Sequence, residues 1–175
     1  MDGSKGVSEQ LYSRQKDFVK ALATQFYVSP NGPRASGAAY GEDVSTIVDF
    51  NENDFARKIS EAKLIKTPRR IERVLQHAAQ MFASRGKDGP KIVVLLTAGS
   101  RQQDSRLIES TSERLRNLGT KIYVVAMGVN HSPQQLNAIT PSAQDVFRIT
   151  SPDNLLSYVR PVAKSSKCNV NVIVL

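Results

Sequence analysis

Short runs of apolar residues alternate with longer amphipathic stretches along most of the chain. Continuous apolar runs of strand length indicate strands buried on both faces, whereas apolar residues at three- and four-residue steps indicate helices. The clearest buried strand is Lys91 to Thr97, which lies between a Gly-Pro pair and Ala98-Gly99. The clearest amphipathic helix covers residues 8–26, with Ser8 as its N-cap. The alternation predicts an α/β fold.

The remaining predicted elements follow in an order typical of a doubly wound, Rossmann-like sheet. Strands at 34–40 and 44–50 form a hairpin, and helices follow at 53–62 and 68–83. Thr67 and Pro68 suit the cap and the first position of the second of these helices. Further elements are a helix at 104–118 ended by Gly119, a strand at 121–127, a helix at 133–139, a strand at 145–149 and a helix at 153–163. We expect a mostly parallel central sheet with one antiparallel edge strand and helices on both faces.

The last predicted strand, residues 169–175, has an unusual place in this order. A doubly wound domain normally opens with such a β-branched central strand, whereas this chain opens with a loop and a helix. We therefore expect residues 169–175 to supply the first central strand of a single domain that covers residues 1–175. A circular permutation explains the order, and so does a cut through tandem repeats, in which the strand could swap into a neighbour. We favour the permutation because the ends of compact domains often lie close together.

Composition narrows the class of protein. A chain of 175 residues with 40% hydrophobic and 23% charged residues is typical of one folded domain. No apolar run approaches the roughly 18 residues of a membrane span, so we expect no membrane insertion. The single cysteine, Cys168, excludes an internal disulfide and any multi-cysteine zinc site. His77 and His131 lie far apart in sequence, and we expect structural or surface roles for both.

The net charge of +8 predicts an attraction to polyanions. One basic cluster is the candidate polyanion-binding surface, although the default interpretation of it is a solvated face: Lys63, Lys66, Arg69, Arg70 and Arg73. No aromatic residues interleave this cluster, so we do not expect nucleic acid as the partner.

Motifs of catalysis are missing from the sequence. There is no phosphate-binding Gly-x-x-x-x-Gly-Lys-Ser/Thr loop, no Gly-x-Gly-x-x-Gly fingerprint and no Gly-x-Ser-x-Gly elbow. We therefore expect a protein that is not an enzyme.

Three segments resemble von Willebrand factor A-type domains. Residues 170–175 followed by Met1-Asp2-Gly3-Ser4-Lys5-Gly6 resemble that family's opening, in which a central strand leads into an Asp-x-Ser-x-Ser loop. Residues 91–99 are similar to its fourth strand with a Thr-Asp-Gly ending, and residues 118–129 are similar to its Leu-Gly-Val-x-Val-Phe-x-Ile-Gly-Val segment. Within that family, these segments are most similar to the extracellular matrix group, which includes collagen VI, matrilins and byssal proteins.

The resemblance implies a metal-ion-dependent adhesion site at the strand ends, in a degenerate form. Asp2 and Ser4 match the first two ligand positions of the family, and Thr67 is the candidate for the ligating threonine. Gly6 and Ala98 stand where the family has a serine and an acid, so two ligands are lost. Oxygen ligands suit Mg²⁺, but the arginines after Thr67 repel a cation. We expect no required cofactor and at most weak binding of Mg²⁺.

The resemblance also implies a function. We expect a secreted, non-catalytic adhesion module of an extracellular matrix protein that binds collagen or another matrix polymer without a complete metal site. Anionic glycosaminoglycan is a second expected partner. Two alternatives stay open: a structural spacer or self-assembly unit of a matrix polymer, and an intracellular scaffold domain of the same family.

Overall fold

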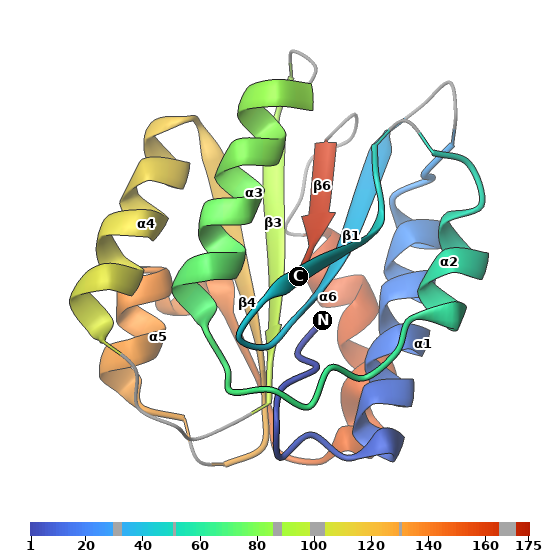
Figure 1. Ribbon diagram of the computed structural model, residues 1–175, viewed down its shortest axis with the longest axis horizontal. Coiled ribbons are helices and arrows are strands. Elements are labelled where there is room, and N and C mark those ends of the chain that lie inside the picture. The colour runs from blue at the N-terminus through green and yellow to red at the C-terminus, as the bar shows by residue number, and fades with distance from the viewer. Residues whose placement is uncertain (30–32, 51, 86–88, 99–103, 130, 165–170) are drawn as a thin grey trace.

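One six-stranded sheet runs through the molecule, in the order β2-β1-β6-β3-β4-β5 (Figure 1). The computed structural model describes the chain except residues 30–32, 51, 86–88, 99–103, 130 and 165–170. The strands are β1 (Arg34–Tyr40), β2 (Val44–Val48), β3 (Lys91–Thr97), β4 (Thr120–Met127), β5 (Val146–Ile149) and β6 (Asn171–Val174). Only the edge strand β2 pairs antiparallel among them. The predicted mostly parallel sheet with one antiparallel edge is confirmed.

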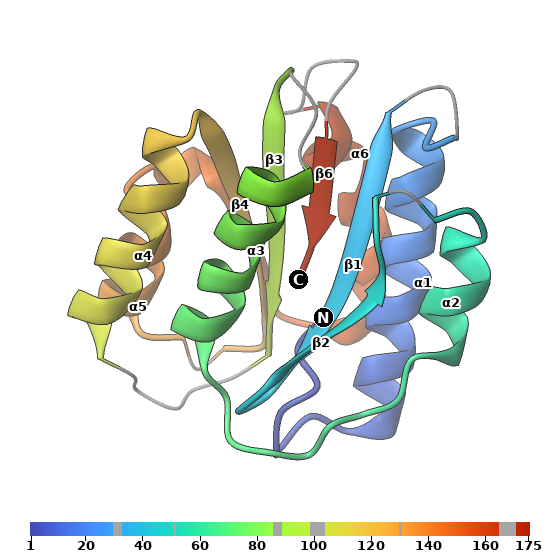
Figure 2. The same cartoon turned by 45° about the horizontal axis from the view of Figure 1, so that its top comes forward.

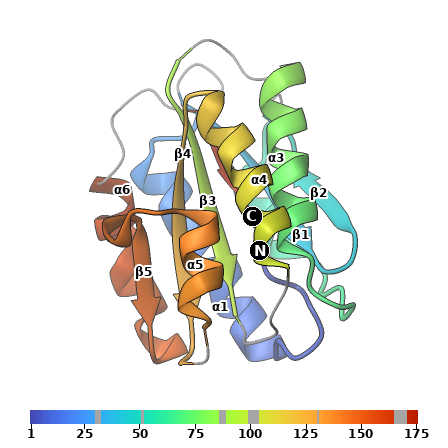
Figure 3. The same ribbon diagram turned by 90° about the vertical axis from the view of Figure 1, so that its left-hand side faces the viewer.

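Helices cover both faces of this sheet, as predicted. The helices are α1 (Glu9–Gln25), α2 (Phe55–Glu61), α3 (Ile71–Arg85), α4 (Ser105–Asn117), α5 (Pro133–Ile139) and α6 (Val159–Lys164), with 3-10 turns η1 (Ala143–Asp145) and η2 (Pro152–Tyr158). Figures 1 and 3 show α1 and α6 on one face, and α3, α4 and α5 on the other. None of the described helices is both long and apolar enough to cross a membrane.

Each face of the sheet carries its own hydrophobic core. Val172 and Val174 point into the core beneath α1 and α6, together with Phe18 and Leu22 of α1. Ile173 and Leu175 point into the core beneath α3, α4 and α5. Because side chains alternate along a strand, both faces of a central strand must be apolar to be buried. The uninterrupted apolar runs of β3, β4 and β6 follow from this requirement.

The C-terminal strand β6 lies in the middle of the sheet, between β1 and β3, as Figure 2 shows. Val172 pairs in parallel with Ala35 on one side and with Ile92 on the other. The strand therefore inserts into the sheet of its own chain. That its position arose by a circular permutation stays a prediction.

The two chain ends continue one line of strand. Gly37 pairs with Val174, and Tyr40 forms an isolated parallel bridge with Asp2. Three steps along the chain lead from Gly37 to Tyr40, and three steps also lead from Val174 through Leu175 and Met1 to Asp2. Leu175 bonds to β3, donating to Val94 O at 2.9 Å, whereas the Met1 carbonyl accepts from Tyr40 N at 3.0 Å on the other side. Met1 and Leu175 thus occupy consecutive positions of the central strand.

Most predicted elements are present, with two local corrections. Helix α3 begins at Ile71, three residues later than predicted, because Thr67 and Pro68 belong to a connection that pairs with the first loop. Residues 152–158 form a 3-10 helix, where the prediction had the start of an α-helix. The predicted caps at Ser8 and at Gly119 are present: Ser8 accepts from Leu11 N at 3.1 Å, and Gly119 has a φ of +74°. Gly99 and Cys168 lie outside the described residues.

Candidate functional site

Loops from three parts of the chain meet at the carboxyl ends of the central parallel strands. The first loop, residues 1–6, continues the line of β6 and is tied to the segment before α3. Gly3 O accepts hydrogen bonds from Ile65 N at 3.1 Å and from Lys66 N at 2.8 Å, and Lys5 N donates to Thr67 O at 2.7 Å. Ala98 follows directly after β3. In doubly wound folds this edge of the sheet is the usual place for a ligand site.

Asp2 is held in this site by Gln15 of helix α1. The Asp2 N–H donates to Gln15 Oε1 at 2.8 Å, and Gln15 Nε2 donates to the Asp2 carbonyl at 3.0 Å. Both residues have no exposed surface. The backbone of Asp2 is therefore fixed relative to α1, and its side chain points to the junction of the loops.

The Asp2 carboxylate is satisfied by donors of the protein itself. Ser4 donates to Asp2 Oδ1 from its hydroxyl at 2.6 Å and from its N–H at 3.1 Å. Ala98 N donates to Asp2 Oδ2 at 2.8 Å. Arg69 Nε lies 3.3 Å from the same Oδ2. A buried carboxylate is stable only when it is paired and hydrogen-bonded, and these contacts meet both conditions.

Arg69 supplies the positive charge in this site. Its side chain is 7% exposed and that of Asp2 is fully buried, so water screens the pair little. Arg69 Nε also lies 3.4 Å from Ser4 Oγ, which contacts Asp2 in turn. Removing one partner of such a buried pair costs about 3–5 kcal/mol, because the other charge is left uncompensated.

The charges of Asp2 and Arg69 also shift the pKa values of neighbouring groups. Burial raises the pKa of Tyr40 well above 10.0, and the negative charge of Asp2 raises it further, whereas Arg69 opposes the rise. Tyr40 Oη donates to Leu96 O at 2.7 Å inside the core. Burial also lowers the pKa of His131, and the charges of Arg69 and Arg148 lower it further. Both groups are therefore neutral at pH 7 and add no charge to the site.

Thr67 has a different partner from the one its family position implies. Its Oγ1 accepts a hydrogen bond from Glu42 N at 2.8 Å. The same hydroxyl lies so close to Gly41 that a Cβ added there would come within 2.2 Å of it. The Thr67 side chain thus stabilises the turn between β1 and β2. The structure brings Asp2 and Ser4 together, but it gives Thr67 another task.

The two positions of the missing ligands differ in character. Ala98 contributes its backbone N–H to Asp2 and has no side-chain oxygen. Gly6 has a φ of +101°, and a Cβ at this position would meet nothing within 4 Å. A serine at residue 6 would fit the space but would be strained by its backbone.

These observations test whether a divalent metal fits the site. Metal sites of hard cations need several oxygen ligands that are free to coordinate. Here the Asp2 carboxylate already has a full set of donors, one of them cationic, and Thr67 is engaged elsewhere. Among the described residues, no three His, Cys, Asp or Glu side chains gather to hold a metal ion. The residues present do not fit a divalent cation.

The predicted basic cluster is mostly paired within the protein. Ion pairs link Lys66 to Glu9 at 3.1 Å, Arg70 to Glu72 at 3.4 Å and Arg73 to Asp43 at 3.3 Å. Lys63 is exposed, and none of its contacts with described residues is an ion pair. Arg69 departs from the prediction of a solvent-facing residue, because it is buried against Asp2.

Gln15 is a residue of the site that the sequence analysis did not identify. Gln15 lies four residues after Leu11 and three before Phe18, so it interrupts the apolar stripe of the first helix, and that interruption is the signal. Arg69 was expected to repel a cation here, but its burial against Asp2 has no local signal because Asp2 is distant in sequence.

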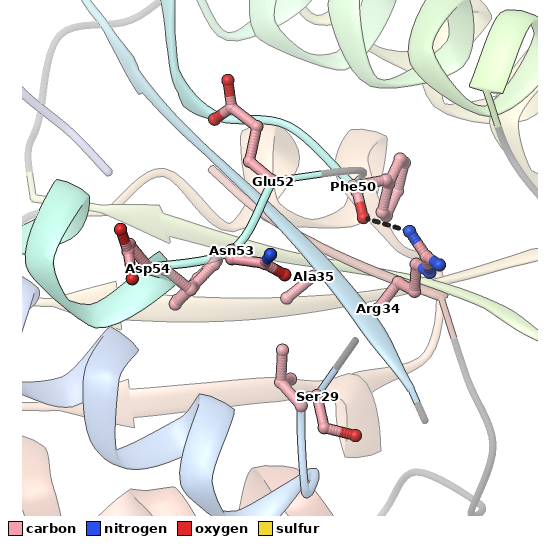
Figure 4. Close-up of a pocket in the computed structure, with 9 residues that line it drawn as sticks. Ser29, Arg34, Ala35, Phe50, Glu52, Asn53 and Asp54 are labelled. Atoms are coloured by element: carbon pink, nitrogen blue, oxygen red, sulfur yellow. Dashed lines mark hydrogen bonds between the residues drawn. The ribbon is translucent and has the colours of Figure 1, made fainter. Parts of the chain in front are cut away.

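A small cavity lies near the opposite end of β1. It has a volume of about 220 Å³ and is lined mainly by Val28, Arg34, Phe50, Glu52 and Asp54 (Figure 4). Arg34 Nη1 donates to Phe50 O at 3.1 Å across its wall. Sites for small ligands typically enclose about 300–1,000 Å³, so this cavity falls below the usual range.

The fold places this chain among the doubly wound α/β domains whose functional loops gather at the carboxyl ends of the strands. Residues 1–160 match the family model of the von Willebrand factor type A domain. The chain belongs to this family, as the resemblance in its sequence predicted.

Two human proteins are similar to this chain in sequence. The human collagen alpha-6(VI) chain is 26% identical over 192 residues, which cover 99% of this chain and 8% of the collagen chain. Human von Willebrand factor A domain-containing protein 2 is 29% identical over 136 residues, which cover 73% of this chain and 18% of that protein. The chain thus spans a small part of the length of these relatives.

Solved structures support the fold. Proximal thread matrix protein 1 from the mussel byssus has a TM-score of 0.84 at 21% identity, over 93% of this chain and 44% of that chain. A second structure of the mussel protein, with a zinc-occupied adhesion-site motif, has a TM-score of 0.82 at 21% identity, over 93% of this chain and 45% of that chain. Members of this fold therefore include metal-loaded forms.

Proposed function

We propose that this chain is a non-catalytic protein-binding module of a secreted extracellular matrix protein, and that it binds collagen or another matrix polymer. Its family, its relation to a collagen VI chain and its structural likeness to a byssal matrix protein support this proposal. The module requires no cofactor and binds Mg²⁺ at most weakly.

One observation carries the proposed mode of binding. The Asp2 carboxylate, which would ligate the metal, is buried and already bonded to Ser4, Ala98 and Arg69. A partner protein that bound by coordinating one of its carboxylates to a metal ion in this site would therefore find no metal ion to coordinate. Binding then depends on the outer surfaces of the loops and helices, through shape and polar contacts.

Glycosaminoglycan is the second partner that we propose. The chain has a net charge of +8, and Lys63 and Lys66 lie exposed near the loop edge. Long-range attraction of this kind raises association rates and weakens with salt. Lys66 is already paired with Glu9, so we expect a modest contribution from each lysine.

Solid-phase binding to collagen tests the proposal. The chain is applied to immobilised collagen in buffer with Mg²⁺, in EDTA, and in EDTA followed by Mg²⁺ again. We expect saturable binding that is the same in all three conditions, and no binding to an albumin surface. Binding that EDTA abolishes would contradict the mode of binding, and an absence of binding to any matrix polymer would contradict the function.

A second candidate function is that of a self-assembly unit of a matrix polymer. The observation that favours it is the central position of β6, whose chain end adjoins Met1. A strand held at the end of a chain can insert into a second copy with the same pairing. Light scattering over a range of protein concentrations separates the candidates, because strand exchange gives dimers and longer species without any collagen.

A further inference from the structure

We propose that Arg69 is the resident cation of this adhesion site: its guanidinium takes the role of the metal ion and keeps divalent cations out. The inference deepens the proposed function, since it explains why binding to a matrix partner would not need a metal. Its test uses the chain alone, without any matrix protein, so that either proposal can fail independently.

The position of the guanidinium is the first argument. Arg69 Nε lies 3.3 Å from Asp2 Oδ2 and 3.4 Å from Ser4 Oγ. Asp2 and Ser4 are the residues that match the family's first two metal-ligand positions. A carboxylate and a hydroxyl that face one buried positive group make the kind of contact that they would make with a metal ion.

The anchoring of Arg69 is the second argument. Its neighbours are tied on both sides: Thr67 O accepts from Lys5 N at 2.7 Å, and Arg70 N donates to Gly41 O at 2.9 Å. The backbone of Arg69 is thereby held between the first loop and the turn after β1. With only 7% of its side chain exposed, the guanidinium cannot leave for solvent without moving these loops.

The effect on a competing cation is the third argument. A metal ion near Asp2 Oδ2 would face the fixed positive charge of Arg69 at a few ångströms in a poorly screened interior. It would also have to replace the donors that Ser4 and Ala98 give to the carboxylate. Removing the guanidinium removes the repulsion and leaves the attraction, since the buried carboxylate then lies beside a hydroxyl and an empty volume. Such a group recruits a hard cation from solution.

Substitution of Arg69 therefore should create a latent cation site. In Arg69→Ala we expect a lower unfolding midpoint than in the unmodified chain. We expect Mg²⁺ and Mn²⁺ to raise that midpoint in a concentration-dependent way, because a ligand of the folded state stabilises it. The unmodified chain should show no shift, and titration calorimetry should detect Mn²⁺ binding to the variant alone. Methylguanidinium should raise the midpoint of the variant as well.

The matched control is Arg116→Ala. Arg116 is a half-buried arginine of α4 whose Nη1 donates to Ile139 O at 3.1 Å, with no carboxylate in that contact. This variant should also be destabilised, but the two cations should not shift its midpoint. A second control is the double variant Asp2→Asn with Arg69→Ala, in which the cation response should be lost.

Three results would overturn the proposal: binding of Mn²⁺ to the unmodified chain as tightly as to Arg69→Ala, an Arg69→Ala variant that folds and ignores both metals, or an equal metal response in Arg116→Ala. If Arg69→Ala does not fold, Arg69→Met retains most of the side-chain volume without the charge. The readout for either variant is then the folded yield after refolding with and without Mn²⁺. A yield that Mn²⁺ leaves unchanged also contradicts the proposal.

Discussion

The Gln15 side chain forms two hydrogen bonds with the backbone of Asp2: it accepts from the Asp2 N–H at 2.8 Å and donates to the Asp2 carbonyl at 3.0 Å. This double contact joins helix α1 to the loop that carries the buried carboxylate. Because both partners are fully buried, the Asp2 backbone has no water to replace the amide of Gln15.

Replacement of Gln15 by leucine should therefore lower the free energy of unfolding by about 1–3 kcal/mol, the typical range when buried polar groups are left unpaired. Urea unfolding followed by circular dichroism measures the change. Gln10 is exposed on the same helix, and Gln10→Leu is the control, for which we expect a change near zero. Similar losses in the two variants would contradict this role of Gln15.

Thr67→Val should destabilise the chain by about 1 kcal/mol, because Glu42 N then loses the acceptor that it contacts at 2.8 Å. If Thr67 acts only on this turn, the response of the protein to Mg²⁺ should be the same before and after substitution. Thermal unfolding with and without Mg²⁺ measures both quantities. If Thr67→Val changed the shift that Mg²⁺ causes in the unfolding midpoint but left the stability without Mg²⁺ unaltered, Thr67 would be a metal ligand instead.

The buried amino group of Met1 predicts a dependence of stability on pH. Burial lowers its pKa from 8.0 to about 4, so the unfolded chain binds a proton between these pH values that the folded chain does not. Stability should fall as the pH drops from 8 to 4, by about 1 kcal/mol at pH 7 and about 4 kcal/mol at pH 5 relative to high pH. Chemical unfolding over this pH range measures the slope.

A rearranged chain isolates this contribution. It begins at Gly6 and runs from Leu175 by a peptide bond into Met1 and on to Lys5, so the buried amine becomes an ordinary amide. His77 and His131, whose pKa values are also lowered by burial, stay in place in both chains. The rearranged chain should be the more stable at pH 7, and its slope between pH 4 and 8 should be the smaller. Equal slopes would show that the histidines dominate.

Heparin affinity checks the proposed polyanion contact. The double variant Lys63→Ala with Lys66→Ala should elute from immobilised heparin at a lower salt concentration than the unmodified chain, since it has lost two exposed charges near the loops. Arg106 and Arg114 are exposed on α4, and their double alanine variant removes the same charge from another surface. Equal shifts in the two variants would mean that net charge, rather than this surface, sets the affinity.

The pattern of apolar residues correctly predicted the helices and strands whose buried positions can be recognised from neighbouring residues alone. The bounds of β3, Lys91–Thr97, and of α5, Pro133–Ile139, are the same as those that the sequence predicted. The central position of β6 was also predicted, because the uninterrupted apolar run from Val172 to Leu175 needs cover on both faces. In each case the determining signal lies within a few neighbouring residues.

The contacts of the site depend on residues that are distant in sequence. Thr67-Pro68 has the local signature of a helix start, but Thr67 O accepts from Lys5 N of the first loop and α3 begins only at Ile71. The basic cluster similarly gave no sign that Arg69 would be buried while Arg70 stays exposed. Only the approach of Asp2 distinguishes the two arginines, and sequence spacing does not encode that approach.

The central place of β6 has a consequence for the order of folding. β1 and β3 do not pair with each other, so among the six strands it is β6 that joins the half-sheet of β1 and β2 to the half-sheet of β3, β4 and β5. Since β6 follows the other five strands in sequence, its pairing with β1 and β3 joins segments that are far apart along the chain. Folding of the sheet then closes in one late, long-range step, which is the kind of step that slows folding and exposes edges to other chains.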